Sequence, residues 1–240
     1  MLSDCIILAG GMGTRLQSVL IDKPKCLADI NGKPFLYYIC QQLKKFNFNK
    51  IIFSVGYQKD MVKDYVLTHL DEFNFTFEFA EEDEPLGTGG AILHALSYSQ
   101  TEDFFVVNGD TLFDVDLEEM LALQQAQMSD CTLALKPMQH ADRYGLVHMD
   151  EKQVITGFEE KKLGATGLIN GGIYCIYRNS FLNIPFPKKF SFEKDYLEAM
   201  IKEREIIGYK QDAYFIDIGI PEDYKRAQIE IPALFRKENK

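Results

Sequence analysis

Cysteine and histidine are too few and too scattered in this chain to suggest a disulfide framework or a structural metal site. The cysteines are odd in number and include no Cys-x-x-Cys pair, and no two histidines have the spacing of paired metal ligands on a helix. Unpaired, widely spaced cysteines are typical of a reducing compartment. The residues are Cys5, Cys26, Cys40, Cys131 and Cys175, and His69, His94, His140 and His148.

Long hydrophobic runs and an excess of positive charge are also absent. No apolar run approaches the roughly 20 residues of a membrane span, and the N-terminus lacks the features of a signal peptide, so we expect a cytoplasmic protein without a membrane partner. Lys and Arg number 26 against 36 Asp and Glu, a formal charge of −10, which argues against a nucleic-acid partner. A local cationic pocket for a small anionic substrate remains compatible with that charge.

What the 240 residues do contain is a regular alternation of strand and helix patterns in the first half. Short hydrophobic runs are followed by helical patterns about four times, which predicts parallel strands covered by helices on both faces. The expected strands are residues 5–9, 50–55, 74–80, 103–107 and 131–135, and the expected helices are residues 34–46, 59–70, 88–98 and 116–127.

After about residue 140 the pattern becomes richer in strands. We expect a hairpin at residues 144–149 and 153–158, a long strand at 168–177, strand pieces within 206–216, and helices at 192–204 and 221–231. The predicted fold class is α/β: a Rossmann-like, doubly wound, mostly parallel sheet with an antiparallel extension. No Gly/Ser linker or charge run separates the halves, so we expect one domain over residues 1–240.

Three glycines and two basic residues follow the first expected strand, at the sheet edge where such folds bind ligands. Glycine lets backbone N–H groups approach a phosphate closely, and the basic side chains can neutralise a polyphosphate. The segment is not a Walker A loop, and it matches a dinucleotide fingerprint poorly because Leu16 replaces the third glycine. A flexible turn with surface cations is the alternative. The residues are Gly10, Gly11, Gly13, Arg15 and Lys25.

The order Gly-Gly-x-Gly-Thr-Arg-Leu at residues 10–16, followed by Pro-Lys at 24–25, resembles the signature of the sugar-1-phosphate nucleotidyltransferases. These enzymes join a nucleoside triphosphate to a sugar 1-phosphate and release pyrophosphate. The resemblance implies that the loop wraps the nucleotide phosphates, that the arginine supports the pyrophosphate and that the lysine contacts the phosphates. It assigns nucleotide binding to Leu8, Gly10, Gly11, Gly13 and Thr14, and catalytic roles to Arg15 and Lys25.

Residues 84–91, Glu-Pro-Leu-Gly-Thr-Gly-Gly-Ala, follow an expected strand and begin an expected helix. Thr88 is a suitable N-cap, so a helix cap with no further role is one interpretation. The segment is also similar to the stretch that lies against the base in mannose-1-phosphate guanylyltransferases, with Gly89 in place of alanine. This similarity favours guanine and implies nucleotide contacts from Glu84, Gly87 and Thr88, with Glu84 or backbone groups accepting from the guanine N1–H and N2–H₂.

Asn108-Gly109-Asp110 follows the strand expected at residues 103–107. A carboxylate at the end of a buried strand can hold Mg²⁺, which prefers oxygen ligands, although the same tripeptide is also good turn chemistry. The resemblance implies that Asn108 contacts the nucleotide and that Asp110 is a catalytic metal ligand. Asp217, in a segment similar to the family's Asp-x-Gly-x-Pro-x-x-Tyr, is implied to be the second metal ligand.

The second half carries motifs that resemble the family's sugar site. Tyr144-Gly145 and Asn170, the latter on a strand with two following glycines, match sugar-binding positions. Glu160-Lys161 resembles a Glu-Lys-Pro motif in which the Glu contacts sugar hydroxyls and the Lys contacts the sugar phosphate. The proline is replaced by Lys162, which is therefore a rival phosphate contact, and a charged solvated loop is the alternative.

The resemblance implies a fold of the nucleotide-diphospho-sugar transferase type, with residues of about 1–135 binding the nucleotide and about 136–240 binding the sugar. It implies Mg²⁺ as cofactor, GTP and a sugar 1-phosphate as substrates, and allows a homo-oligomer. The short chain is most similar to guanylyltransferases that use D-glycero-α-D-manno-heptose 1-phosphate to make GDP-heptose for surface polysaccharide. Alternatives are mannose 1-phosphate, a thymidylyl- or uridylyltransferase for a hexose 1-phosphate, and a non-catalytic nucleotide-sugar-binding subunit.

Overall fold

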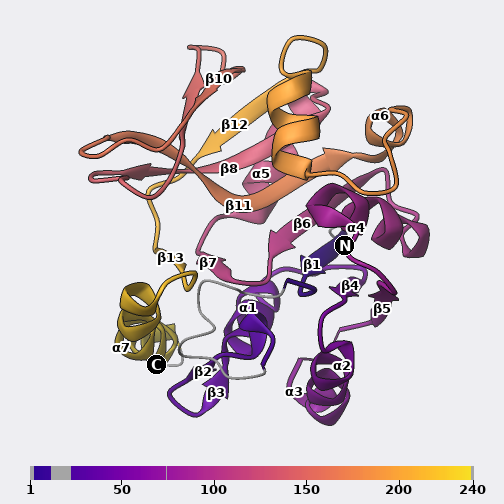
Figure 1. The fold of residues 1–240 in the computed structure, drawn as a ribbon, viewed down its shortest axis with the longest axis vertical. Helices are drawn as coiled ribbons and strands as arrows, with labels where there is room; N and C mark the ends of the chain where they lie inside the picture. The colour runs from indigo at the N-terminus through magenta and orange to yellow at the C-terminus, as the bar shows by residue number, and fades with distance from the viewer. Residues whose placement is uncertain (1–2, 12–22, 74, 239–240) are drawn as a thin grey trace.

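The computed structural model describes residues 3–11, 23–73 and 75–238, and within these residues a nine-stranded β-sheet runs through both halves of the chain (Figure 1). The strand order is β10-β9-β11-β6-β1-β4-β5, and β8 pairs with β11 and β12. The sheet strands are β1 (Asp4–Leu8), β4 (Ile51–Val55), β5 (Phe77–Glu81), β6 (Asp103–Asn108), β8 (Cys131–Met138), β9 (Leu146–Met149), β10 (Ile155–Glu159), β11 (Gly167–Tyr177) and β12 (Ile206–Lys210).

The first half forms the parallel part of the sheet, β6-β1-β4-β5. Its strands read as continuous hydrophobic runs because both faces are covered, and neighbouring side chains enter different cores. Cys5 and Ile7 lie in one hydrophobic cluster, whereas Ile6 between them lies in the other. This confirms the α/β class and the parallel strands predicted from the sequence.

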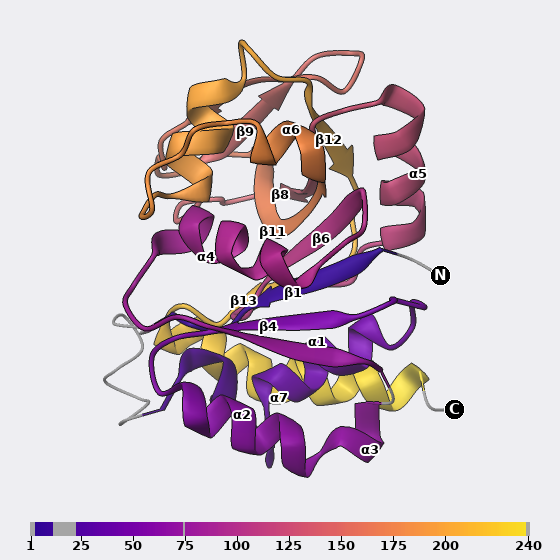
Figure 2. The ribbon, with the colours of Figure 1, turned by 90° about the vertical axis from the view of Figure 1, so that its right-hand side faces the viewer.

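Helices cover the two faces of the parallel strands (Figure 2). On one face α1, α2 and α7 contribute to the first cluster, and on the other face α4 contributes to the second. The helices, 3-10 turns and one π-helix of the described residues are η2 (Lys25–Leu27), α1 (Phe35–Leu43), α2 (Lys59–Thr68), α3 (Leu70–Phe73), α4 (Gly87–Ala95), η3 (Leu96–Tyr98), α5 (Leu117–Gln127), α6 (Arg178–Leu182), η4 (Phe192–Glu198) and α7 (Pro221–Glu238). None of these helices is long and apolar enough to cross a membrane.

The second half joins the same sheet through the long strand β11. Ile173 to Tyr177 pair antiparallel with β6, while the whole length of β11 runs beside β8, with a bulge between Asn170 and Tyr174. The hairpin of β9 and β10 continues the sheet from the first part of β11. The antiparallel extension expected after residue 140 is therefore confirmed.

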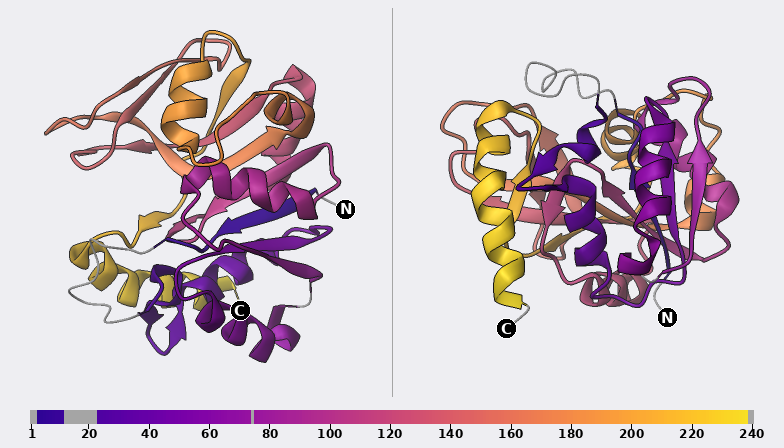
Figure 3. Two further views of the ribbon diagram at one scale, coloured as in Figure 1. Left: turned by 45° about the vertical axis from the view of Figure 1, so that its right-hand side comes forward. Right: turned by 90° about the horizontal axis from the view of Figure 1, so that it is seen from below.

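The end of the chain returns to the first half. Strand β13 (Phe215–Asp217) pairs with β7 (Thr111–Phe113) in a separate two-stranded sheet, and α7 then runs back past α1 (Figure 3). Tyr38 of α1 and Phe235 of α7 have ring centroids 5.2 Å apart. This return brings Asp217 beside the end of β6.

Several short elements differ from the sequence expectation. The pair β2 (Asp29–Ile30) and β3 (Lys33–Pro34) was not expected, nor was β7. Two or three residues are too few to show a period, so such strands leave no pattern in the sequence. Strand β5 begins at Phe77 rather than at residue 74, and the helix expected at 192–204 is a π-helix that ends at Glu198.

Candidate active site

A cleft of about 700 Å³ opens at the carboxyl ends of the parallel strands. Its walls come from the segments that follow β1, β4, β5 and β6, the edge at which open α/β sheets bind ligands. Of the predicted site residues, Leu8, Gly10, Gly11, Lys25, Glu84, Gly87, Thr88, Asn108 and Asp110 line it. Gly13, Thr14 and Arg15 lie outside the described residues.

Close backbone contact at Gly109 places Asp110 at this edge. The Gly109 N–H donates to the Leu8 carbonyl at 3.0 Å, and a Cβ on Gly109 would lie 2.4 Å from that oxygen. Only glycine allows the turn after β6 to approach the end of β1 so closely. The Asn-Gly-Asp turn is therefore packed against the glycine loop.

Three charged side chains meet beside this turn: Lys25, Asp110 and Asp217. The Lys25 ammonium forms an ion pair with the Asp110 carboxylate, and the Lys25 side chain is only 12% exposed. Asp217 ends β13, opposite Thr111 of β7, and the Ile218 N–H donates to the Asp110 carbonyl at 3.0 Å. The structure thus brings together the two aspartates that the sequence analysis predicted as metal ligands.

The charges at this corner suit a cation. Burial raises the pKa of Asp217, and the neighbouring Asp110 raises it further, while Lys25 and Arg143 oppose the shift. Two nearby carboxylates disfavour each other's ionised form, and a divalent cation relieves that repulsion. Among the described residues, no group of three or more His, Cys, Asp or Glu side chains is arranged so that it could hold a metal ion. Two carboxylates leave coordination positions for water and phosphate, which is how Mg²⁺ is commonly held.

Glu82 is a cleft residue that the sequence analysis missed. Its carboxylate accepts from the Leu86 N–H at 3.1 Å and from the Ser54 hydroxyl at 3.3 Å, so its position is fixed. Glu84, the predicted base contact, also lines the cleft, but its side chain is 64% exposed and pairs with Lys188 at 2.5 Å. Residues 81–84 are four acidic residues in a row, so composition alone could not show which of them faces the cleft.

The sequence analysis offered Thr88 as the N-cap of a helix, and the structure shows that this is wrong. Helix α4 begins at Gly87, and the Thr88 hydroxyl donates to Glu193 at 2.7 Å and accepts from the Phe192 N–H at 2.9 Å. Glu193 also lines the cleft and is a second residue that the sequence analysis missed. It belongs to the π-helix η4, so the second half of the chain contributes to the cleft wall.

The predicted sugar-binding residues lie in three places. Tyr144 packs on Phe215 of β13 with centroids 5.8 Å apart, which places it near Asp217. Asn170 donates to the Tyr174 hydroxyl and accepts from the Gly172 N–H, both at 2.9 Å. A Cβ on Gly172 would lie 2.8 Å from the Asn108 amide nitrogen, so this turn of β11 approaches the cleft.

The remaining sugar-side residues are further from the cleft or more exposed. A Cβ on Gly145 would lie 2.8 Å from the Glu159 carbonyl oxygen, so Gly145 allows close pairing of β9 and β10. Glu160, Lys161 and Lys162 are exposed on the loop between β10 and β11 and do not line the cleft. Their roles stay predictions.

An open α/β sheet with a glycine-lined cleft and two converging aspartates at its carboxyl edge has the architecture of a nucleotide-binding enzyme. Residues 4–233 match the family described as nucleotidyl transferase, and the chain belongs to that family. Enzymes of this family generally use a divalent metal. The family resemblance of the glycine loop is thereby confirmed.

Two curated relatives match nearly the whole chain. The D-glycero-alpha-D-manno-heptose 1-phosphate guanylyltransferase of Aneurinibacillus thermoaerophilus is 43% identical over 228 residues, which cover 95% of this chain and 98% of that protein. The protein of the same name from Campylobacter jejuni is 44% identical over 220 residues, with 91% and 96% covered. Among solved structures, HddC from Yersinia pseudotuberculosis complexed with GMP-PN has a TM-score of 0.84 and 38% identity, with 95% and 98% covered.

Proposed function

We propose that this protein is a guanylyltransferase that joins GTP and D-glycero-α-D-manno-heptose 1-phosphate, giving GDP-heptose and pyrophosphate. The observation that carries this proposal is the similarity to two curated enzymes of that name, at 43–44% identity and at least 96% of their length. The cleft supports the proposal because it joins a phosphate-type loop to Asp110 at the ligand-binding edge of the sheet, and Asp217 lies beside Asp110.

The reaction is an in-line displacement at the α-phosphorus of GTP. An oxygen of the sugar 1-phosphate forms the new bond to phosphorus, and the bond from phosphorus to the oxygen bridging to the β-phosphate breaks. The electron pair leaves with pyrophosphate. Because the attacking oxygen is already anionic, no general base is needed, and catalysis depends on positioning and on charge stabilisation.

The residues of the cleft suit these tasks. The backbone at Gly10 and Gly11 can approach the nucleotide phosphates, and Lys25, together with Arg15 of the same loop, would stabilise negative charge on them. Asp110 and Asp217 would hold Mg²⁺, which when bound neutralises phosphate charge and orients the two reacting phosphates. The Lys25 ammonium would then leave Asp110 for the nucleotide.

Guanine recognition requires an acceptor for N1–H and N2–H₂. The fixed carboxylate of Glu82 is the acceptor that the geometry favours, and Glu84 is the alternative on the rim of the cleft. On the sugar side we propose Tyr144, Gly145, Glu160 and Asn170 as sugar contacts. Lys161 or Lys162 would reach the sugar phosphate from the loop after β10.

The proposed function is tested by measuring pyrophosphate release with Mg²⁺ for each nucleoside triphosphate against heptose, mannose and glucose 1-phosphates. We expect release with GTP and the heptose phosphate. Release with GTP and mannose 1-phosphate, but not with the heptose phosphate, would support guanine as the base and show that the proposed sugar is wrong. Release only with dTTP or UTP would overturn the assignment of guanine as the base. Nucleotide binding without pyrophosphate release from any pair would indicate a regulatory subunit.

The metal role of Asp110 predicts a clear difference between two nearby carboxylates. Asp110→Asn should lower kcat by about 100-fold or more, the scale of losing one transition-state contact. Asp114→Asn is the matched control, because Asp114 pairs with Lys45 at 3.1 Å outside the cleft. Steady-state pyrophosphate release measures both, and equal kcat values for the two variants would remove Asp110 from the mechanism.

A further inference from the structure

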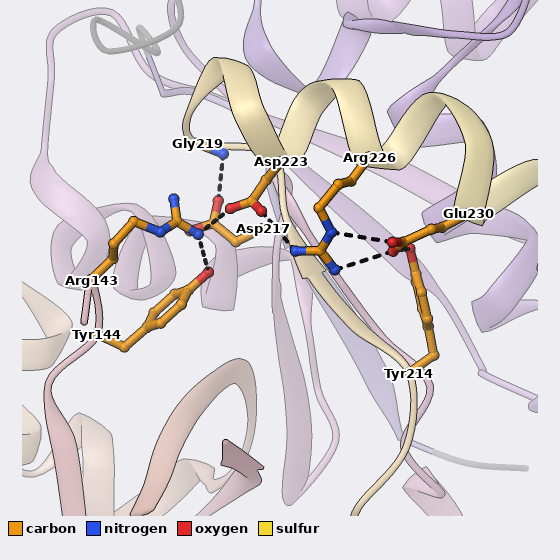
Figure 4. A network of polar contacts seen from close by, with 8 residues as sticks. All are labelled: Arg143, Tyr144, Tyr214, Asp217, Gly219, Asp223, Arg226 and Glu230. Carbon is orange, nitrogen blue, oxygen red and sulfur yellow. Dashed lines mark hydrogen bonds and ion pairs between the residues drawn. The ribbon is translucent and has the colours of Figure 1, made fainter. Parts of the chain in front are cut away.

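A buried carboxylate on the last helix holds two arginines from different parts of the chain (Figure 4). Asp223 is only 5% exposed and lies in the first turn of α7. Its carboxylate accepts from Arg143, on the loop before β9, and from Arg226 Nη1 at 2.8 Å. A buried carboxylate is costly unless it is paired, so these contacts fix both guanidinium groups relative to α7.

The two arginines differ in how fully their charges are balanced. Arg226 also donates to Glu230, from Nε at 3.1 Å and from Nη2 at 3.2 Å, and so has two carboxylate partners. Among the residues that the structure describes, Arg143 has Asp223 as its only carboxylate partner, and the same Nη2 also donates to the Tyr144 hydroxyl at 3.0 Å. Within the described part of the chain, Nε and Nη1 of Arg143 donate to no acceptor, and its side chain is 38% exposed. Arg143 therefore keeps donors and positive charge for a further anion.

Arg143 lies at the corner where the reacting phosphates must meet. Figure 4 shows its guanidinium beside Asp217, and its charge acts on that carboxylate. Asp217 in turn lies against the turn that carries Asp110, and Asp110 pairs with Lys25 of η2. Lys25 approaches this corner from the first half of the chain, and Arg143 approaches it from the second.

In the proposed reaction the sugar 1-phosphate is the second phosphate compound to enter the site. Its negative charge must approach Asp110 and Asp217, which repel it unless a cationic group is nearby. A guanidinium that is held in place by a buried partner is suited to that task, because its planar N–H groups match phosphate oxygens and its rotamers are already restricted. We propose that Arg143 binds the phosphate group of the sugar 1-phosphate, and that Asp223 is a positioning residue that presents Arg143 to it. This inference rests on the proposed function.

Four variants test the proposal: Arg143→Met, Arg143→Lys, Asp223→Asn and, as the matched control, Arg226→Met. Each arginine-to-methionine change removes one ion pair to Asp223, and Arg226→Met also removes the pair with Glu230, so both should lower thermal stability and Arg226→Met at least as much as Arg143→Met. Only Arg143→Met should weaken binding of heptose 1-phosphate, by about 10-fold or more, the scale of a charged hydrogen bond. Arg143→Lys should restore part of the affinity, because the charge returns without the planar fork.

Binding is measured by calorimetric titration of the sugar 1-phosphate into protein saturated with a GTP analogue whose α–β bridge is a methylene group and cannot be cleaved, and KM is measured for each substrate. The KM for the sugar phosphate should rise in Arg143→Met and, to a smaller extent, in Asp223→Asn, with the KM for GTP unchanged. Equal sugar-phosphate affinity in the folded Arg143→Met and Arg226→Met variants would overturn the inference and leave the network purely structural.

The titration also separates this inference from the proposed function. If wild-type protein binds a sugar 1-phosphate but transfers no guanylyl group, the proposed function fails while the comparison of variants still decides the role of Arg143. If wild-type protein turns over and the arginine variants are indistinguishable, only the inference fails. If wild-type protein binds no sugar phosphate at all, both fail.

Discussion

Asp217 is the single residue at which stability and function are most clearly opposed. Burial and the nearby Asp110 both raise its pKa, so the folded state disfavours its ionised form. A carboxyl whose folded pKa exceeds its unfolded pKa costs stability at neutral pH, and that cost disappears below the unfolded pKa, where both states are protonated. A divalent cation would remove the same cost.

We therefore expect Asp217→Asn to leave the metal-free protein at least as stable as wild type at neutral pH while activity falls sharply. The asparagine can still accept from the Gly219 N–H, which Asp217 Oδ1 does at 2.7 Å. Urea unfolding at a series of pH values without metal checks this, and any stability gain should shrink as the pH falls through the pKa of Asp217. A variant that is clearly less stable at neutral pH would contradict the assigned cause.

Glu82 and Glu84 offer a second comparison between neighbouring residues. Glu82→Gln should reduce kcat/KM for GTP by about 10- to 100-fold, because the amide cannot accept both guanine donors in the same way. Glu84→Gln should have a smaller effect, since Glu84 is paired with Lys188 on the rim of the cleft. Values of kcat/KM for GTP and ATP show which glutamate contacts guanine. A larger loss in Glu84→Gln than in Glu82→Gln would support Glu84, the residue predicted from the sequence.

The sequence could predict site residues only where a local motif marked them. The glycine loop and Asn-Gly-Asp are such motifs, and the cleft contains those of their residues that the structure describes. Asp217 was assigned through the family resemblance, and its place beside Asp110 depends on the pairing of β7 with β13. Glu193 carries no motif that the sequence analysis used, and it is recognised only because Thr88 packs against η4.

At the scale of elements, the alternation of strand and helix was readable because the parallel strands are buried on both faces. Their continuous hydrophobic runs gave β1, β4 and β6 within about a residue of the observed bounds. What could not be read were elements fixed by tertiary contact alone. Within the described chain, strand β7 pairs with β13 alone, and its three residues have no period of their own.

The contact between α4 and the segment before η4 predicts a steric effect at Gly89. A Cβ there would lie 2.1 Å from the Phe190 ring, which is buried and stacks on Phe186 with centroids 4.1 Å apart. Gly89→Ala should therefore destabilise the protein by about 1–3 kcal/mol. This cost is expected here even though the similar segment of mannose-1-phosphate guanylyltransferases has alanine at this position.

The matched test of that contact is a double-mutant cycle with Phe190→Leu, measured by denaturant unfolding. The smaller leucine should leave room for the new methyl group, so the double variant should be more stable than the sum of the single changes predicts. Additive effects would mean that Gly89 is required for the backbone rather than for the ring. Thr88 and Glu193 lie at the same contact, so the cleft geometry should change with it.

At the scale of the whole molecule, one sheet joins the segments proposed to bind the nucleotide and the sugar. Strand β11 pairs with β6 of the first half along Ile173 to Tyr177, and α7 returns to pack near α1. The cleft itself draws Glu193 from the second half. A chain connected in this way should unfold in one transition, and such a result would agree with the single domain predicted from the sequence.

This connection predicts that a nucleotide stabilises both halves together. A GTP analogue at about 100 times its Kd should raise the unfolding free energy by about 2.7 kcal/mol, provided that it binds only the folded protein. Hydrogen exchange followed by peptide mass spectrometry reports the halves separately, with β1 and β4 representing the first and β8 and β12 the second. Protection from global unfolding should rise equally in all four strands, whereas CTP should change none of them. Protection confined to β1 and β4 would show that the halves open independently, because a ligand can stabilise only the cooperative unit that contains its site.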